Sequence, residues 1–161
     1  MMKLRFLAAF ILLGLAKLSH ASTHQIEVRD VYAKATFAMA TTAAVYMTLE
    51  NQSDKERQLN SVTVDKTLAD EAQIHTTQMV GEMAKMREVK KGVTLPSHQA
   101  VQFMPGGHHI MLLGLKRPLK KGDSFMLTLL FDEGASHSVN VIVRKEHPVP
   151  TQSEHHHDSH H

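Results

Sequence analysis

The chain contains no cysteine and no tryptophan among its 161 residues, and aromatic residues make up only 5% of it. Without cysteine the fold has no disulfides and must rely on its apolar core. The absence of thiols also excludes a cysteine nucleophile and a thiolate metal ligand. The cysteine-ligated blue-copper sites of electron-transfer proteins are excluded with them.

A long apolar run is found at the N-terminus, from Phe6 to Leu18, and Lys17 interrupts it. Lys3 and Arg5 precede this run, and the small-x-small segment Ser19-His20-Ala21 follows it. This order predicts a signal peptide over residues 1–21, cleaved on export to the periplasm. An uncleaved membrane anchor is the alternative, but the run is short for a bilayer and polar sequence follows at once.

A basic excess is also lacking. The whole chain has 18 Lys and Arg against 16 Asp and Glu, and Lys3, Arg5 and Lys17 lie in the expected signal. Removing these three leaves 15 basic against 16 acidic residues, a net charge of −1 with neutral histidine. This balance gives no basis for nucleic-acid binding.

Histidine and methionine are abundant, with 13 and 10 residues. An exported chain without thiols that is rich in imidazoles and thioethers is typical of proteins that handle soft metal ions. Composition alone does not identify a metal site, because ligands must also be spaced so that the fold brings them together.

Short β-branched and apolar segments separated by turn residues run through the middle of the chain, and no long 3.6-residue period stands out. They predict an all-β antiparallel sandwich or barrel as a single domain over residues 22–146. One short helical turn is expected at Thr67 to Ala72. Residues 147–161 lack the apolar residues needed for packing, so a disordered tail is expected. The expected strands are 26–32, 43–49, 59–64, 73–77, 86–89, 93–95, 100–104, 109–115, 124–131 and 136–143.

Two local patterns carry the chemistry. In His109-Ile110-Met111 the alternation of a strand puts an imidazole and a thioether on one face, while Ile110 and His108 face away. His75 precedes Met79, Met83 and Met86 around a turn expected near Gly81. A hairpin there would bring one histidine and one or two methionines to a common point.

Two imidazoles with two thioethers favour Cu(I), because neutral, soft thioethers bind it better than Cu(II), Zn(II) or Fe(II). The alternative is that each methionine fills the core and each histidine is a hydrogen-bonded surface residue. On this basis Met39, Met47 and Met126 are expected in the core, and His98 and His137 at the surface.

The combined pattern resembles the periplasmic copper chaperone family PCuAC over nearly all of residues 26–144. The matching stretches are 44–51, 73–77, 83–89 and 105–123, which include Gln73-Ile74-His75, Met83-Ala84-Lys85-Met86 and Pro105-Gly106-Gly107-His108-His109-Ile110-Met111.

The resemblance implies a cupredoxin-like β-sandwich that binds Cu(I) through His75, Met86, His109 and Met111, with Met79 as an auxiliary ligand. It also implies copper delivery toward the dinuclear copper centre of cytochrome c oxidase. The partner would be subunit II of the oxidase or a Sco-type protein. We expect a monomer with no membrane anchor after cleavage. Residues 36–42 depart from the Pro/Gly-containing loop of many members, which leaves the shape of this loop open.

Two accessory sites are expected outside the sandwich. The tail histidines would prefer Cu(II) or Zn(II) because no methionine accompanies them; an expression tag is the alternative, and Asp158-Ser159 within the run argues against it. They are His155, His156, His157, His160 and His161. If cleavage follows Ala21, the new terminus Ser22-Thr23-His24 could bind Cu(II) in a square plane. A cut elsewhere removes that site.

Two other functions compete with copper delivery. A copper sequestration or tolerance protein would use the same ligands. An enzyme is the third class, but the sequence has neither G-x-S-x-G nor His-Glu-x-x-His, so we expect no catalysis.

Overall fold

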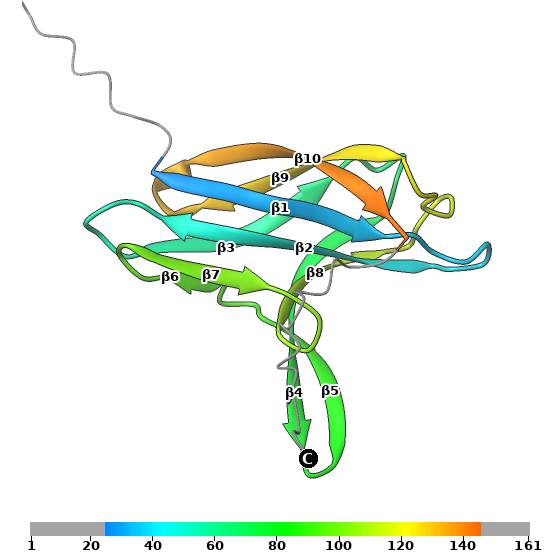
Figure 1. The fold of residues 1–161 in the computed structure, drawn as a ribbon, viewed down its shortest axis with the longest axis horizontal. Helices are drawn as coiled ribbons and strands as arrows, with labels where there is room; N and C mark the ends of the chain where they lie inside the picture. The colour runs from blue at the N-terminus through cyan, green and yellow to red at the C-terminus, as the bar shows by residue number, and fades with distance from the viewer. Residues whose placement is uncertain (1–24, 146–161) are drawn as a thin grey trace, which may run out of the picture.

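The computed structural model describes residues 25–145, and Figure 1 shows their arrangement as strands with short connections. One 3₁₀ turn, η1 (Asp132–Gly134), separates the last two strands. The part of the chain described holds no helix long and apolar enough to cross a membrane. The strands are β1 (Ile26–Lys34), β2 (Thr42–Asn51), β3 (Arg57–Val64), β4 (Glu71–Val80), β5 (Met83–Glu88), β6 (Val93–Leu95), β7 (Gln99–Phe103), β8 (His108–Leu113), β9 (Ser124–Phe131) and β10 (Ser136–Arg144).

The strands form one sheet in the order β5-β4-β8-β7-β2-β1-β10-β9-β3-β6. Neighbours are antiparallel except β1 with β10 and β7 with β8. The sheet folds over itself, so that β3 contacts β4 and β6 contacts β2 and β7 (Figure 1). The expected all-β sandwich is therefore confirmed.

Each expected strand is present with small shifts of its ends, but the helical turn expected at Thr67 to Ala72 is wrong. Asp65 instead accepts hydrogen bonds from the backbone of Leu68 and Ala69, and its carboxylate accepts from Thr67. The chain makes a single turn there and enters β4 at Glu71. A side chain that satisfies the backbone locally competes with helix formation.

The core lies between the two halves of the folded sheet. Met47 is buried there, as expected. Met39 and Met126 were also expected in the core, and this is wrong: 84% and 53% of their surfaces are exposed. Met39 lies in the turn between β1 and β2, and Met126 occupies an outward position of β9 between inward neighbours. Hydrophobicity alone does not tell which face of a strand a methionine takes.

The loop of residues 36–42 is held at both ends, at its far end by the Leu115 N–H, which donates to the Thr41 carbonyl, and at its start by Thr36. The Thr36 N–H donates to the Leu119 carbonyl, and the Leu119 N–H donates to the Thr36 hydroxyl. Within the loop, the Ala40 N–H donates to the Phe37 carbonyl and closes a turn. The loop therefore has a defined shape without the proline and glycine of the PCuAC pattern.

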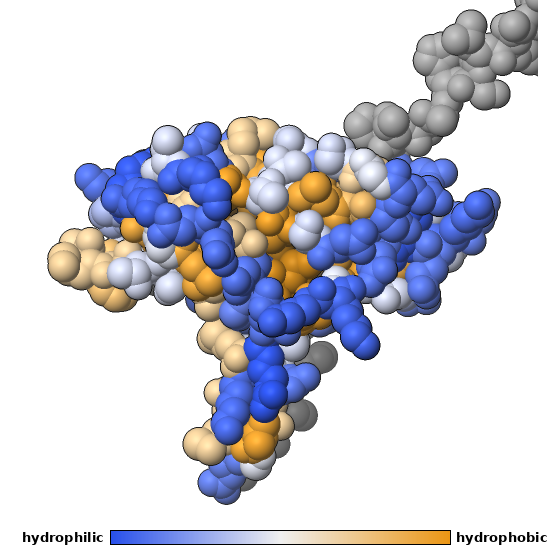
Figure 2. All heavy atoms as spheres, turned by 180° about the vertical axis from the view of Figure 1, so that it is seen from behind, coloured by the Kyte–Doolittle hydropathy of each residue, from blue (hydrophilic) through white to orange (hydrophobic). Residues whose placement is uncertain are grey.

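The β4–β5 hairpin stands out from the body of the sandwich (Figures 1 and 2). Its two turn residues are Gly81 and Glu82, and Gly81 has φ +63°, as a tight hairpin turn of type II′ requires. The turn expected near Gly81 is thus confirmed. All six residues of β5 are exposed, so the outer half of the hairpin is open to solvent on this edge.

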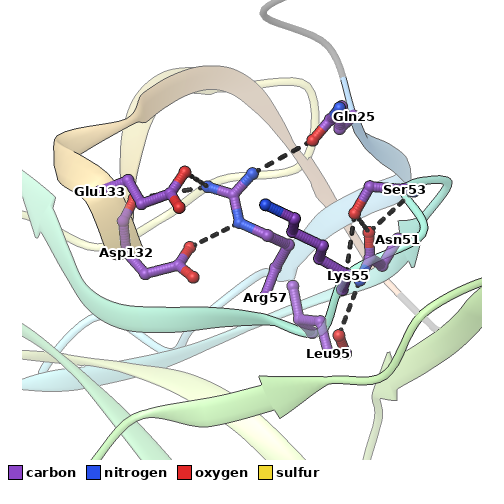
Figure 3. A network of polar contacts seen from close by, with 8 residues as sticks. All are labelled: Gln25, Asn51, Ser53, Lys55, Arg57, Leu95, Asp132 and Glu133. Carbon is purple, nitrogen blue, oxygen red and sulfur yellow. Dashed lines mark hydrogen bonds and ion pairs between the residues drawn. The ribbon is translucent and has the colours of Figure 1, made fainter.

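A network of polar side chains lies where β2 ends and β3 begins, next to η1 (Figure 3). Asn51 is fully buried; its amide donates to the carbonyls of Lys55 and Leu95, and its oxygen accepts from the Ser53 N–H. Nearby, the Arg57 guanidinium lies 2.8 Å from the Asp132 carboxylate. The buried amide of Asn51 is thus satisfied at both ends, as a buried polar group must be.

Candidate metal centre

Two histidines from adjacent strands face each other at the root of the hairpin. His75 of β4 is directly opposite His109 of β8 in the antiparallel ladder. Their ring centroids are 5.9 Å apart, and His109 is only 3% exposed. Directly opposed positions are the closest side-chain pairs a sheet offers. The structure therefore brings together two imidazoles that are 34 positions apart in the sequence.

Thioethers lie on the same face. Met111 is two residues beyond His109 in β8 and opposite Gln73, so it shares the face of both histidines. Met86 of β5 pairs with Thr77, which puts it diagonally next to His75. Met86 is 62% exposed, whereas Met111 is half-buried. The four predicted ligands thus occupy one patch that runs from a buried to an exposed side.

Hydrogen bonds fix both imidazole rings. His109 Nδ1 is 3.1 Å from the Gly107 carbonyl oxygen, and His75 Nε2 is 3.0 Å from Gln73 Oε1. The opposite nitrogens, His75 Nδ1 and His109 Nε2, are buried and have no hydrogen-bond partner among the described residues. A buried polar atom without a partner is costly unless something binds it.

Burial lowers the pKa of His75 below its ordinary 6.5, and the neighbouring His109 lowers it further, against a smaller raising effect of Glu88. Burial also lowers the pKa of His108, followed by the influence of His109. His75 is therefore neutral at pH 7, the state in which imidazole binds a metal.

A row of aromatic rings backs this patch, and no pattern in the sequence predicted it. Tyr46 of β2 lies 6.4 Å from His109, and Tyr32 of β1 lies 5.2 Å from Tyr46, centroid to centroid. Tyr32 reaches this face because a bulge between Arg29 and Tyr32 shifts the register of β1; within it, Asp30 adopts φ +54°. Bulges have no clear sequence signal, so alternation alone could not assign Tyr32 to the site.

Met79, the auxiliary candidate, lies on the patch face farther along the hairpin and is 66% exposed. Met83, opposite Val80, is on the other face and therefore away from the histidines. His108 also faces away, as expected, with its ring 5.7 Å from that of Phe103. His98 is exposed and bonded to Asp54, as expected, while His137 is half-buried.

Within residues 25–145 no three His, Asp or Glu side chains gather closely enough to hold a metal ion. A metal bound between His75 and His109 would therefore need thioethers to complete its ligand set. Such a set favours a soft, monovalent ion.

Comparison with known proteins decides the family. The family described as "LpqE-like: Putative lipoprotein LpqE-like" matches residues 26–143, which is most of the chain. The protein belongs to the LpqE-like family. The fold that the PCuAC resemblance predicted is confirmed as well, since the LpqE-like chain shares it with the solved apo PCuAC domain from PmoF1. The TM-score between this chain and the PmoF1 domain is 0.62 at 22% identity, over 76% of this chain and 95% of that domain.

A likeness that is closer in sequence is to the Cu(I)-bound form of DR1885 from Deinococcus radiodurans. The LpqE-like chain is 33% identical to it, with a TM-score of 0.58, over 78% of this chain and 84% of that one.

Two relatives also match in sequence. The chain is 36% identical over 83 residues to a putative lipoprotein of Leifsonia xyli and 36% identical over 106 residues to an uncharacterized protein of Rickettsia prowazekii. These matches cover 52% and 66% of the LpqE-like chain, and they span only 50% and 58% of the two relatives.

The remaining predicted sites of the LpqE-like protein lie outside the described residues. These are the signal peptide, the Ser22-Thr23-His24 terminus and the tail histidines His155, His156, His157, His160 and His161. A separate pocket of about 680 Å³ lies beside Arg57, lined among others by Lys55 and His137. It holds none of the predicted ligands.

Proposed function

We propose that this protein is an exported copper chaperone that carries Cu(I) between His75, His109, Met86 and Met111. The cargo would be held by two neutral imidazoles and two thioethers, without any chemical change to a substrate. The proposal extends to this chain the Cu(I) that the similar DR1885 structure contains.

One observation carries the proposal. Two imidazole nitrogens lie buried and without partners on rings 5.9 Å apart, on a sheet face that also presents two methionines. A purely structural histidine pair would be expected to satisfy its nitrogens with protein groups, as the Asn51 network does. Two lone pairs left without a protein partner on neighbouring rings fit a bound cation.

The exposure of the ligands supports a carrier rather than a storage site. Met86 is 62% exposed, while His109 is 3% exposed. An incoming ligand from a partner can therefore displace the Met86 thioether first, while the buried His109 still holds the ion. Stepwise exchange of this kind gives transfer without releasing free copper. Met79, exposed farther out on the same face, would be the first point of contact.

The partner and compartment follow from the family resemblance and the N-terminal sequence. We propose export to the periplasm and delivery toward the dinuclear copper centre of cytochrome c oxidase, through subunit II or a Sco-type protein. In support, the family description and one relative's name are those of putative lipoproteins.

The test is a Cu(I) titration against a competing chromophoric chelator, under reducing conditions. A variant with the five tail histidines changed to alanine isolates the sandwich. One equivalent bound tightly, and lost in a His109→Ala, Met111→Ala variant, is the expected result. Equal binding by both variants would overturn the ligand assignment.

Growth experiments distinguish delivery from copper tolerance. A deletion strain should lose oxidase activity at low copper if the protein delivers the metal. If the strain instead respires normally and dies at high copper, sequestration is the function and the delivery proposal is wrong.

The tail histidines remain a separate prediction. We propose that they bind Cu(II) or Zn(II) in a weaker, independent site. Isothermal titration of the full chain and of the tail-alanine variant with Zn(II) would detect it as a difference between the two, and identical isotherms would rule it out.

A further inference from the structure

The two buried nitrogens that lack partners are different atoms of the two rings. One is Nδ1 of His75 and the other is Nε2 of His109. The difference follows from the group that contacts the other nitrogen of each ring. In both rings this group is an oxygen that can only accept a hydrogen bond.

Gln73 determines the state of His75. The amide nitrogen of Gln73 lies 2.9 Å from the Glu71 carboxylate, which only accepts hydrogen bonds, so this end of the amide must be the NH₂ group. The amide oxygen then points at His75 Nε2, 3.0 Å away. Because that oxygen only accepts, His75 Nε2 carries the hydrogen and Nδ1 keeps its lone pair. Every second position of β4 lies on the same face, and Glu71, Gln73 and His75 occupy three such positions.

Gly107 determines the state of His109 in the opposite sense. Its carbonyl oxygen, 3.1 Å from His109 Nδ1, only accepts, so Nδ1 carries the hydrogen and Nε2 keeps its lone pair. The same oxygen accepts the backbone N–H of Thr77 at 3.2 Å. A main-chain carbonyl at the end of the Pro105-Gly106-Gly107 loop therefore holds this ring.

We infer that Gln73 is a positioning residue for the metal site, and that Cu(I) is bound by Nδ1 of His75 and by Nε2 of His109. This inference rests on the proposed function, because it assigns atoms within the site proposed there. Groups that hold the far nitrogen of a ligating histidine fix its tautomer and ring orientation and raise its basicity. Here Glu71 orients Gln73, and Gln73 orients His75.

The binding atoms can be read directly with Ag(I), a spectroscopic stand-in for Cu(I) whose nuclear spin couples to a bound ¹⁵N. The sample is the full chain with its five tail histidines changed to alanine, labelled with ¹⁵N-histidine and given one equivalent of Ag(I). We expect splitting at His75 Nδ1 and at His109 Nε2. Splitting at Nε2 of both rings would overturn the inference and leave the copper site intact. No Ag(I) binding would overturn the proposed function and the inference together.

The role of Gln73 is tested by substitution. Gln73→Leu removes the acceptor and should lower Cu(I) affinity about 10- to 100-fold, as loss of an outer-shell partner does. The exchange Glu71→Gln, Gln73→Glu keeps an acceptor beside His75 Nε2 and an amide donor at position 71 to orient it, and should restore most of the affinity. The matched control is Gln78→Leu, an exposed glutamine on the other face of the same strand, with affinity unchanged. Equal affinity and unchanged ¹⁵N splitting in Gln73→Leu would exclude the positioning role.

Discussion

Two polar clusters of this sandwich differ in how completely they satisfy themselves. In the Asn51 cluster, both ends of a fully buried amide are paired, and the Arg57 guanidinium has a carboxylate beside it (Figure 3). In the His75–His109 cluster, two buried nitrogens have no partner among the described residues. The first arrangement holds the fold together. The second leaves binding capacity open, as the proposed metal site requires.

The largest effect should come from removing a buried ligand. His109→Asn is expected to lower Cu(I) affinity more than 100-fold, more than ~2.7 kcal/mol, because even outer-shell changes cost 10- to 100-fold. His98→Asn, at an exposed histidine bonded to Asp54, is the matched control and should bind normally. Competition titration against a Cu(I) chelator measures both variants. Equal losses in the two would mean that histidine content, not position, determines binding.

The Asn51 cluster should respond in the opposite way. Asn51→Ala leaves the carbonyls of Lys55 and Leu95 without their donor and should lower the free energy of unfolding by about 2 kcal/mol. Copper affinity of the folded protein should not change. Asn140→Ala, at an exposed position of β10, should cost less than about 0.5 kcal/mol. Urea denaturation measures both, and a copper defect in Asn51→Ala would undo the separation of the two clusters.

The thioethers should contribute less than the buried imidazole. Met86→Leu keeps a similar volume and loses the sulfur, so we expect about a tenfold loss of Cu(I) affinity, ~1.4 kcal/mol. Met126→Leu, an exposed methionine of β9, should leave affinity unchanged. Met79→Leu should cost less than about threefold, and should slow transfer to an acceptor more than it weakens binding. Chelator competition gives the affinities, and stopped-flow transfer to the chelator gives the rates.

The smallest effect appears only at high pH, in the aromatic row behind the histidines. Burial raises the pKa of Tyr32 to about 12, with a further contribution from Tyr46, against the lowering effect of Arg144. Burial raises the pKa of Tyr46 as well. The folded chain holds fewer phenolates than the unfolded chain above pH 10, so this contribution to stability is present below pH 10 and lost as the pH rises toward 12.

Phenolate absorbance provides the measurement for these tyrosines, which are the two tyrosines of the chain. Ionisation in the native protein should lag behind that in denaturant. Coincident curves would show that the row is open to water.

Much of this molecule could be predicted from the sequence, because period-2 alternation determines both strands and faces. That rule anticipated the shared face of His109 and Met111, and the turn at Gly81. It could not reveal that His75 pairs directly with His109, since the register of distant strands depends on the whole sheet. Nor could it reveal that Gln73 and Gly107 hold the rings. Those bonds depend on orientation within the folded patch, and the bulge that turns Tyr32 toward it is a local departure from alternation.

The Gly107 oxygen has one more consequence. It accepts both the Thr77 N–H at the root of the protruding hairpin and the Nδ1–H of His109. A partner that binds the hairpin and tilts it would displace the Gly107 oxygen, which also holds the ring of the buried His109. Movement of the hairpin would then weaken the binding of Cu(I). Release would depend on contact with the recipient protein and not on a fall in copper concentration.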